Sequence, residues 1–534
     1  MNTRWLQFFV FLLLVACFRV TAAAGSDATT LDTVEVAGRR PSCNGVWVMT
    51  SGGTDAQCFD EGFVRGRLGR DPTDINNYHI PDGFTSSGGT LIDGKIAGVL
   101  DDCGGIGNPI LPSTGNKIEP ELDFATSEEF GLYLQRTYNA HWSAATIFGR
   151  RWVTNFDYML TFGALSNTNN CSRPGGIDCS IGSSTQILAW RPDGRTIMFL
   201  KGTDGVFYED KPNPVAKIVS NGASGFTLYG ENDSVESYSQ YGRVQSVKNE
   251  HGIGWTYAYS ANFPVSVTHT SGRSVQFTWS GDRLVQVRDP AGNAYNYTYL
   301  NHPYGYNYSH ILASTTKPGA PATTITYHYE LVDGAGKRRD RLTGKSFNGI
   351  RYSKFTYDNY DRATSTEHNG LDKYTLSYTQ GSNGDLTTVI TNPLGKQTTH
   401  RFKNGKSIEV TGHASTYCPA SYAATVYDSN GYAQLKSDFN GNNTSFAYNA
   451  KGQLTHKIEA YGTAVARKTT YIWDAVKNRL VSLTVGGTAS GSEWLSISYA
   501  YTADNRIASV THTNLSPYGL ITSPYNQQVT AYIY

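Results

Sequence analysis

The sequence predicts an all-β protein in which one antiparallel sheet is built from a repeated unit. Three kinds of position recur every twenty residues. They are the valines Val247, Val267 and Val287, the glycines Gly252, Gly272 and Gly292, and the aromatic pairs Tyr257/Tyr259, Phe277/Trp279 and Tyr297/Tyr299. A fixed period of this size is typical of repeat architectures.

Each repeat reads as a strand, a glycine-containing turn and a second strand. Residues i and i+2 share one face of a strand, so each aromatic pair points to one side. A single hairpin is too small to be stable, and stacked neighbours must bury one another's aromatic face. We therefore expect a continuous antiparallel sheet from about residue 120 onward, with Tyr259, Trp279 and Tyr299 on the same face.

Composition agrees with this fold class and excludes some partners. The chain has 534 residues, with 36 Tyr and 55 Gly against 4 Met, which favours strands and turns over helices. The 45 Lys and Arg residues balance 44 Asp and Glu residues. No nucleic acid partner is expected, because such proteins usually carry a basic face. The basic run 337–339 with Arg341 is interpreted as a solvated loop.

The N-terminus is typical of an export signal. Arg4 precedes an apolar run, Trp5–Phe18, that is short for a membrane span. Small residues end the segment, so residues 1–24 are the predicted signal peptide, cleaved between Ala24 and Gly25. A rival interpretation is a lipobox that ends at Cys17, and only lipidation there would attach the protein to a membrane. The expected location is secreted, periplasmic or cell-surface, with an outer-membrane lipoprotein as the lipidated form.

Six cysteines lie beyond Cys17, and an even number in an exported chain indicates disulfides. Cys171 with Cys179, and Cys43 with Cys58, are candidate pairs, although the sequence cannot choose among the pairings. Residues 25–106 are rich in Gly, Asp and Ser and are predicted to be loop-rich.

Looser copies of the repeat continue toward the C-terminus. They begin at Tyr357-Asp358, Tyr427-Asp428, Tyr448 and Trp473-Asp474. This pattern resembles the Tyr-Asp (YD) repeat of the Rhs family, and residues 231–534 are assigned to it, ending in mid-strand. These seven residues are interpreted as structural positions of the repeat.

The upstream region resembles the domain of unknown function that opens many Rhs proteins. The similarity rests on an alternating run, Leu132–Asn139, and on the motif Phe148–Trp152. That domain usually carries a glycine just before the Trp, where this chain has Arg151. Residues 107–230 are assigned to this N-terminal β domain.

The resemblance implies a function. In the Rhs family the repeats wind into a spiral sheet that closes into a hollow shell around a toxic C-terminal domain. Neither the family's core segment nor a toxin is recognisable here. The resemblance therefore implies a partial Rhs-type β shell: an exported, truncated scaffold for toxin delivery between competing bacteria. Its implied partner is a downstream core or toxin chain. The alternative is a cell-surface protein that binds a glycan through its many aromatic rings.

No catalytic or cofactor-binding motif occurs in the sequence. Metal-ligand spacing and phosphate-binding loops are absent, so no enzyme activity, cofactor or metal is expected. The carboxylates Asp358, Asp361 and Glu367 recur with the repeat and are interpreted as turn residues. The uncharged final run, Gln528–Tyr534, is predicted to form an exposed edge strand that promotes self-association.

Overall fold

The computed structural model describes residues 45–49, 56–60 and 106–533, with gaps in the last range. The gaps are 108, 143–144, 164–184, 193, 211–213, 231–232, 302–309, 333–339, 382–384, 404, 413–420, 429 and 516–525. Residues 1–24, and with them Cys17, Ala24 and the predicted cleavage site before Gly25, lie outside the described residues, as do Cys43, Cys171 and Cys179. Cys58 is described only as a backbone position in a strand.

The described secondary structure consists of strands and one short 3-10 helix, Gly222–Ser224. The strands before the main sheet are β1 (Gly45–Met49), β2 (Ala56–Asp60), β3 (Ile110–Leu111), β4 (Asn116–Ala125), β5 (Tyr133–Asn139), β6 (Ala145–Thr146), β7 (Gly149–Arg150) and β8 (Trp152–Thr154). The first half of the main sheet comprises β9 (Met159–Gly163), β10 (Gln186–Trp190), β11 (Thr196–Lys201), β12 (Phe207–Glu209), β13 (Lys217–Ser220), β14 (Phe226–Tyr229), β15 (Val235–Tyr238), β16 (Val244–Lys248), β17 (Gly254–Ser260), β18 (Phe263–His269), β19 (Ser274–Ser280), β20 (Arg283–Arg288), β21 (Ala294–Asn301), β22 (His310–Lys317) and β23 (Thr323–His328). The second half comprises β24 (Gly344–Phe347), β25 (Ile350–Tyr357), β26 (Ala363–His368), β27 (Tyr374–Gln380), β28 (Asp385–Thr391), β29 (Gln397–Lys403), β30 (Lys406–Gly412), β31 (Ser421–Tyr427), β32 (Ala433–Ser437), β33 (Asn443–Tyr448), β34 (Leu454–Glu459), β35 (Arg467–Trp473), β36 (Leu480–Gly486), β37 (Glu493–Tyr501), β38 (Ile507–Asn514) and β39 (Gln527–Ala531).

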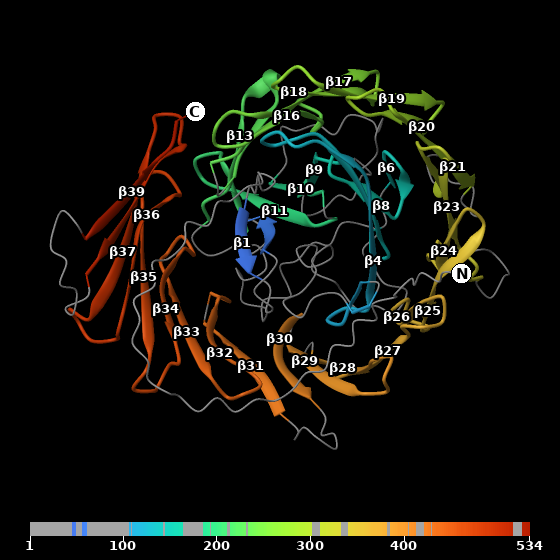
Figure 1. The fold of residues 1–534 in the computed structure, drawn as a ribbon. Helices are drawn as coiled ribbons and strands as arrows, with labels where there is room; N and C mark the ends of the chain where they lie inside the picture. The colour runs from blue at the N-terminus through green and yellow to red at the C-terminus, as the bar shows by residue number, and fades with distance from the viewer. Residues whose placement is uncertain are drawn as a thin grey trace, which may run out of the picture. The chain divides into compact units, whose positions relative to one another are not determined.

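One antiparallel sheet of 31 strands runs in chain order from β9 to β39. Figure 1 shows this order as a continuous change of colour from green to red. The sheet is not closed, because β39 pairs with β38 but not with β9. The all-β repeat sheet expected from the sequence is thus confirmed. It begins at Met159 rather than near residue 120, because the preceding strands form small sheets of their own.

The second aromatic of each early repeat pair lies at a β-bulge. The pairing register shifts at Tyr259, Trp279 and Tyr299, and the shift recurs at later aromatics. Those later positions are Tyr357, Tyr427, Tyr448, Trp473 and Tyr501. A bulge bends and twists its strand, so the repeat motif places a bend in each strand that carries one of these aromatics.

The side chain at the bulge ties one hairpin to the preceding one. The Tyr259 hydroxyl donates to the Val244 carbonyl at 2.8 Å, and the Trp279 indole N–H donates to the Pro264 carbonyl at 2.7 Å. Tyrosine and tryptophan suit this position because each has a large apolar ring with a polar donor at its edge. Tyr259, Trp279 and Tyr299 all pack against one core, as their spacing predicted.

The first strand of the main sheet also touches the turn before β16. Met159 forms an isolated bridge with Arg243, and the Leu160 N–H donates to the Gly242 carbonyl at 2.8 Å. A Cβ at Gly242 would lie 2.0 Å from the Leu160 carbonyl oxygen, so this contact requires glycine. Backbone contacts therefore hold the start of the main sheet against the connection between β15 and β16.

Candidate functional site

Residues 107–157, here called the docking segment, pack on one face of the main sheet. We call this the packed face; it carries Trp255, Phe277, Tyr297, Tyr327 and Phe355. The ring contacts between the two are Phe130–Trp255 at 4.8 Å, Phe148–Tyr297 at 4.7 Å, Trp152–Tyr327 at 4.6 Å and Phe156–Phe277 at 5.7 Å between centroids. Most of these rings belong to a single buried core, so the segment supplies one side of that core.

Close backbone approach accompanies this packing. Gly149 has a φ of 86°, and a Cβ there would lie 2.3 Å from the His310 carbonyl oxygen. Only glycine combines that conformation with that contact. The Phe148-Gly149 part of the sequence motif thus places a ring and a bare backbone against the sheet.

A buried arginine forms the first of three ionic clusters at this contact. The Arg136 guanidinium donates to both Asp123 oxygens at 2.7 and 2.8 Å and to the Tyr327 hydroxyl at 2.9 Å. Asp123 also accepts from the Tyr297 hydroxyl at 2.9 Å. Burial acts to raise the pKa of Asp123, but the charge and hydrogen bonds of Arg136 outweigh it and lower that pKa.

The second cluster alternates charges between the segment and strand β24. Lys345 lies 2.5 Å from Glu119 and 2.6 Å from Glu121, and Lys117 lies 2.5 Å from Glu119. The Lys117 ammonium also lies 4.2 Å from the centre of the Phe355 ring. Burial is the largest influence on Lys117 and lowers its pKa. Two lysines and two glutamates therefore share one buried site, and each lysine lies beside a carboxylate.

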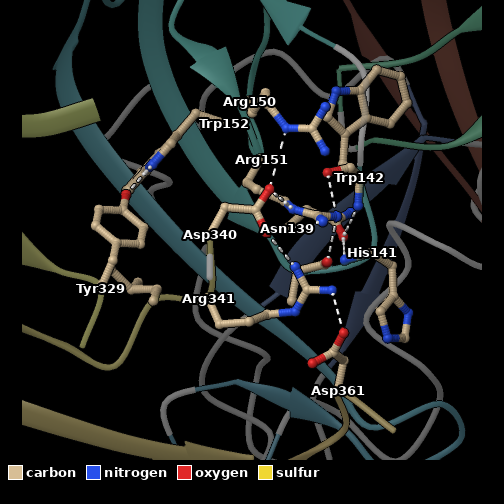
Figure 2. A network of polar contacts seen from close by, with 12 residues as sticks. Asn139, His141, Trp142, Arg150, Arg151, Trp152, Tyr329, Asp340, Arg341 and Asp361 are labelled. Atoms are coloured by element: carbon tan, nitrogen blue, oxygen red, sulfur yellow. Dashed lines mark hydrogen bonds and ion pairs between the residues drawn. The ribbon is translucent and has the colours of Figure 1, made fainter. Parts of the chain in front are cut away.

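The third cluster is drawn in Figure 2. Asp340 accepts from Arg150 at 3.2 Å and from Arg151 at 3.0 Å on the docking segment, and from its neighbour Arg341 at 2.8 Å. Arg341 reaches on to Asp361 at 2.8 Å. Burial acts to raise the pKa of Asp340, but the three arginines lower it far below its usual range.

His141 lies beside this cluster and is neutral. Burial is the main cause that lowers its pKa to about 3, and the charges of Arg341 and Arg151 act in the same direction. Its backbone N–H donates to the Asn116 and Asn139 side-chain oxygens at 3.1 and 3.0 Å. A neutral imidazole here avoids adding a fourth cation to the three arginines of the cluster.

Two residues of the third cluster occupy backbone positions that favour glycine. Arg151 has a φ of 68° and Asp361 a φ of 62°. Arg151 stands where the resembled domain usually carries glycine, and Asp361 stands where the repeat beginning at Tyr427-Asp428 has Gly431. A left-handed conformation costs about 1–2 kcal/mol for a residue with a side chain. At both positions the side chain takes part in the ion pairs with Asp340 and Arg341 that offset this cost.

The repeat residues predicted from sequence have structural roles in the sheet. The Tyr357 and Tyr427 hydroxyls donate to the carbonyls of Leu342 and Ser407, and the Trp473 indole donates to Leu454. Tyr448 instead stacks on Tyr432 at 4.9 Å between ring centroids.

The aspartates that follow these aromatics shape the turns. Asp358 Oδ1 accepts the backbone N–H groups of Tyr360 and Arg362, each at 2.9 Å. Asp428 and Asp474 accept from their own turns in the same way. A short carboxylate that replaces backbone acceptors stabilises such a turn. The Tyr-Asp pair therefore encodes a bulge and a turn.

The three ionic clusters have no signature in the local sequence. Arg341, interpreted as part of a solvated loop, is only 7% exposed and lies in the third cluster. Arg136 lies in the alternating run Leu132–Asn139, two residues from both Leu134 and Tyr138. An arginine on the apolar face of a strand was the one sequence feature that could have indicated a buried ion pair. The partners of Arg136 on β21 and β23 are far away in sequence, so no local pattern could reveal them.

The ion pairs of the second and third clusters join the docking segment to β24 and to the connection that precedes it. Among the described residues there is no group of His, Cys, Asp and Glu side chains that could hold a metal ion. The carboxylates of the three clusters lie within hydrogen-bond distance of a lysine or arginine, as in structural ion-pair networks. Asp157 differs, because burial raises its pKa to about 6 and it accepts hydrogen bonds from Thr154 and from the Ile147 N–H. Within the part of the chain that the structure describes, no helix has the length and apolar character needed to cross a bilayer.

Comparison with known proteins identifies one domain. The model of a domain of unknown function, DUF6531, matches residues 107–199. No curated protein matches the chain. This match contains the docking segment and the first strands of the main sheet.

Solved structures give distant similarities. A crystal structure of TcdB2-TccC3-TEV has 11% sequence identity and a TM-score of 0.26, and the match covers 77% of this chain and 23% of that chain. The Photorhabdus luminescens Tc holotoxin pore has 10% identity and a TM-score of 0.22, with 74% and 22% covered. This chain thus spans about a quarter of the length of these proteins. Similarity at this level defines neither fold nor function.

Proposed function

We propose that this protein is an exported scaffold of the Rhs type that serves toxin delivery between competing cells. The observation that carries the proposal is a DUF6531 match whose segment packs along a continuous repeat sheet. The Tyr-Asp repeats supply bulges and turns, and the docking segment supplies one side of the core. Such a framework suits holding another polypeptide rather than catalysing a reaction.

The glycan-binding alternative requires aromatic rings that are free to stack on a sugar. In the early repeats the rings of Tyr259, Trp279 and Tyr299 pack against the core, and their polar atoms donate to backbone carbonyls. This arrangement leaves those rings poorly suited to sugar stacking. The scaffold proposal is therefore preferred.

The test is coexpression with the polypeptide encoded immediately downstream in the genome. The full chain alone should leave the growth of a sensitive bacterium unchanged, and it should copurify with that polypeptide. The Arg136→Ala variant tests whether binding needs the contact between the docking segment and the packed face. If it does, this variant should no longer copurify with the downstream polypeptide. Growth arrest by the chain alone, or an intact chain that binds a neutral polysaccharide but not the downstream product, would contradict the proposal.

A further inference from the structure

Two connections between late strands of the main sheet make polar contacts with residues much earlier in the chain. Arg506, in the turn between β37 and β38, lies 3.8 Å from Glu129 of the docking segment. The Asn478 N–H, in the turn between β35 and β36, donates to Asp233 before β15 at 3.3 Å. These contacts join residues more than two hundred positions apart, and one is an ion pair and the other a hydrogen bond.

Glu129 is already fixed to the early repeats. Its carboxylate accepts from the Asn249 side chain at 2.9 Å and pairs with His251. The neighbouring backbone carbonyl of Phe130 accepts from the Trp255 indole at 2.9 Å. The carboxylate is therefore held in place before Arg506 reaches it, which lowers the entropy cost of the pair.

The Arg506 side is also organised. Arg506 lies 3.2 Å from Asp504 in its own turn, and Asn505 accepts from Lys477 at 3.0 Å and from Arg479 at 2.6 Å. The turns on either side of β36 and β37 are thus linked to each other. A displacement of either connection should therefore move both of them together.

We propose that Glu129 is an electrostatic latch that holds the last repeats of the sheet to its first repeats. The latch consists of partly exposed charges, with 24% of the Arg506 side chain and 32% of the Glu129 side chain accessible. Such pairs are weak and are screened by salt. Ionic conditions, or a charged partner that competes for Glu129, therefore release the late turns. This inference is independent of the proposed function.

The experiment is hydrogen exchange of the full chain, followed in peptides that cover 502–514. Glu129→Lys places a cation opposite Arg506 and should speed exchange there about two- to fivefold, the range expected for loss of an exposed ion pair. The double variant Glu129→Lys/Arg506→Glu should restore slow exchange. The matched control is Arg401→Glu, which breaks an exposed pair with Glu409 between neighbouring strands and should leave 502–514 unchanged.

A purely local role for Glu129 predicts a different result. Exchange would then rise only around Asn249–Trp255, and the double variant would show no rescue. That pattern would overturn the proposal. Should Glu129→Lys fail to fold, a salt titration of the unmodified protein provides the second test. Exchange in 502–514 should rise with salt while exchange in β10 and β11 stays constant, and the absence of such a rise would also overturn it.

Discussion

The early and late halves of the main sheet share the same hairpins but differ in burial. Tyr299 in β21 and Tyr501 in β37 donate their hydroxyls to carbonyls of the preceding hairpin at 2.7 and 2.6 Å. Tyr299 packs against the core built with the docking segment. By contrast, of the apolar side chains described after residue 403, only Tyr432 and Ala433 are buried. The repeat motif thus builds the sheet, whereas the docking segment determines where it acquires a core.

The largest expected effect comes from the buried Arg136. Arg136→Ala leaves the buried Asp123 without its arginine, with Lys317 and the Tyr297 hydroxyl as its remaining partners, and should lower the free energy of unfolding by about 3–5 kcal/mol. Arg479→Ala, in the late half, removes a partly exposed pair with Asp474 and a hydrogen bond to Asn505, and it should cost much less than Arg136→Ala. Chemical denaturation of both variants provides the measurement.

A double variant sharpens this test. Arg136→Met with Asp123→Leu replaces both charges by apolar side chains and should recover most of the lost stability. Equal losses of stability for Arg136→Ala and Arg479→Ala would show that the packed face is no more tightly held than the late repeats.

Two tryptophans give the next comparison. Trp152 is fully buried between the docking segment and β23, whereas Trp473 is half-buried in β35. Trp152→Ala should cost about 3–5 kcal/mol through the cavity that it leaves. Trp473→Ala should cost about 1–2 kcal/mol, because the half-buried Trp473 side chain buries less apolar area on folding than Trp152 does. Thermal unfolding of the two variants would separate these values, and the opposite ranking would contradict the account.

The third cluster predicts a pH dependence. The folded pKa of Asp340 is lowered, so its stabilisation is complete above the unfolded pKa near 4 and is lost as the pH falls below that value. Asp340→Asn should therefore be less stable than the unmodified protein by about 2–3 kcal/mol at pH 7, with the gap narrowing below about pH 4. Glu459→Gln, at a more exposed pair in β34, should barely change the acid unfolding curve. Denaturation series at several pH values would test this.

The smallest effect is expected from the turn aspartates. Asp358→Ala removes an acceptor of two backbone N–H groups and should cost about 1 kcal/mol. Asp358→Asn keeps the acceptor oxygen and should cost less. A similar loss for Asp428→Ala in the late half is expected, because the turn is the same in both halves.

The sequence was sufficient to predict the sheet and insufficient to predict the contact on it. The twenty-residue register placed Tyr259, Trp279 and Tyr299 on one face because bulges and turns are determined by neighbouring residues. Arg136 and Asp340 depend on partners far along the chain, so their burial could not be predicted. The glycine missing before Trp152 was visible in the sequence, but its consequence, an arginine with positive φ paired to Asp340, appeared only in three dimensions.

Hydrogen exchange along the unmodified full chain tests the central claim most directly. If the docking segment stabilises the early half, amides of β17–β27 should exchange at least about tenfold more slowly than those of β33–β38. Arg136→Ala should speed exchange in β17–β27 and leave β33–β38 nearly unchanged. Equal protection in both halves, or an Arg136→Ala effect spread evenly over the sheet, would contradict the account.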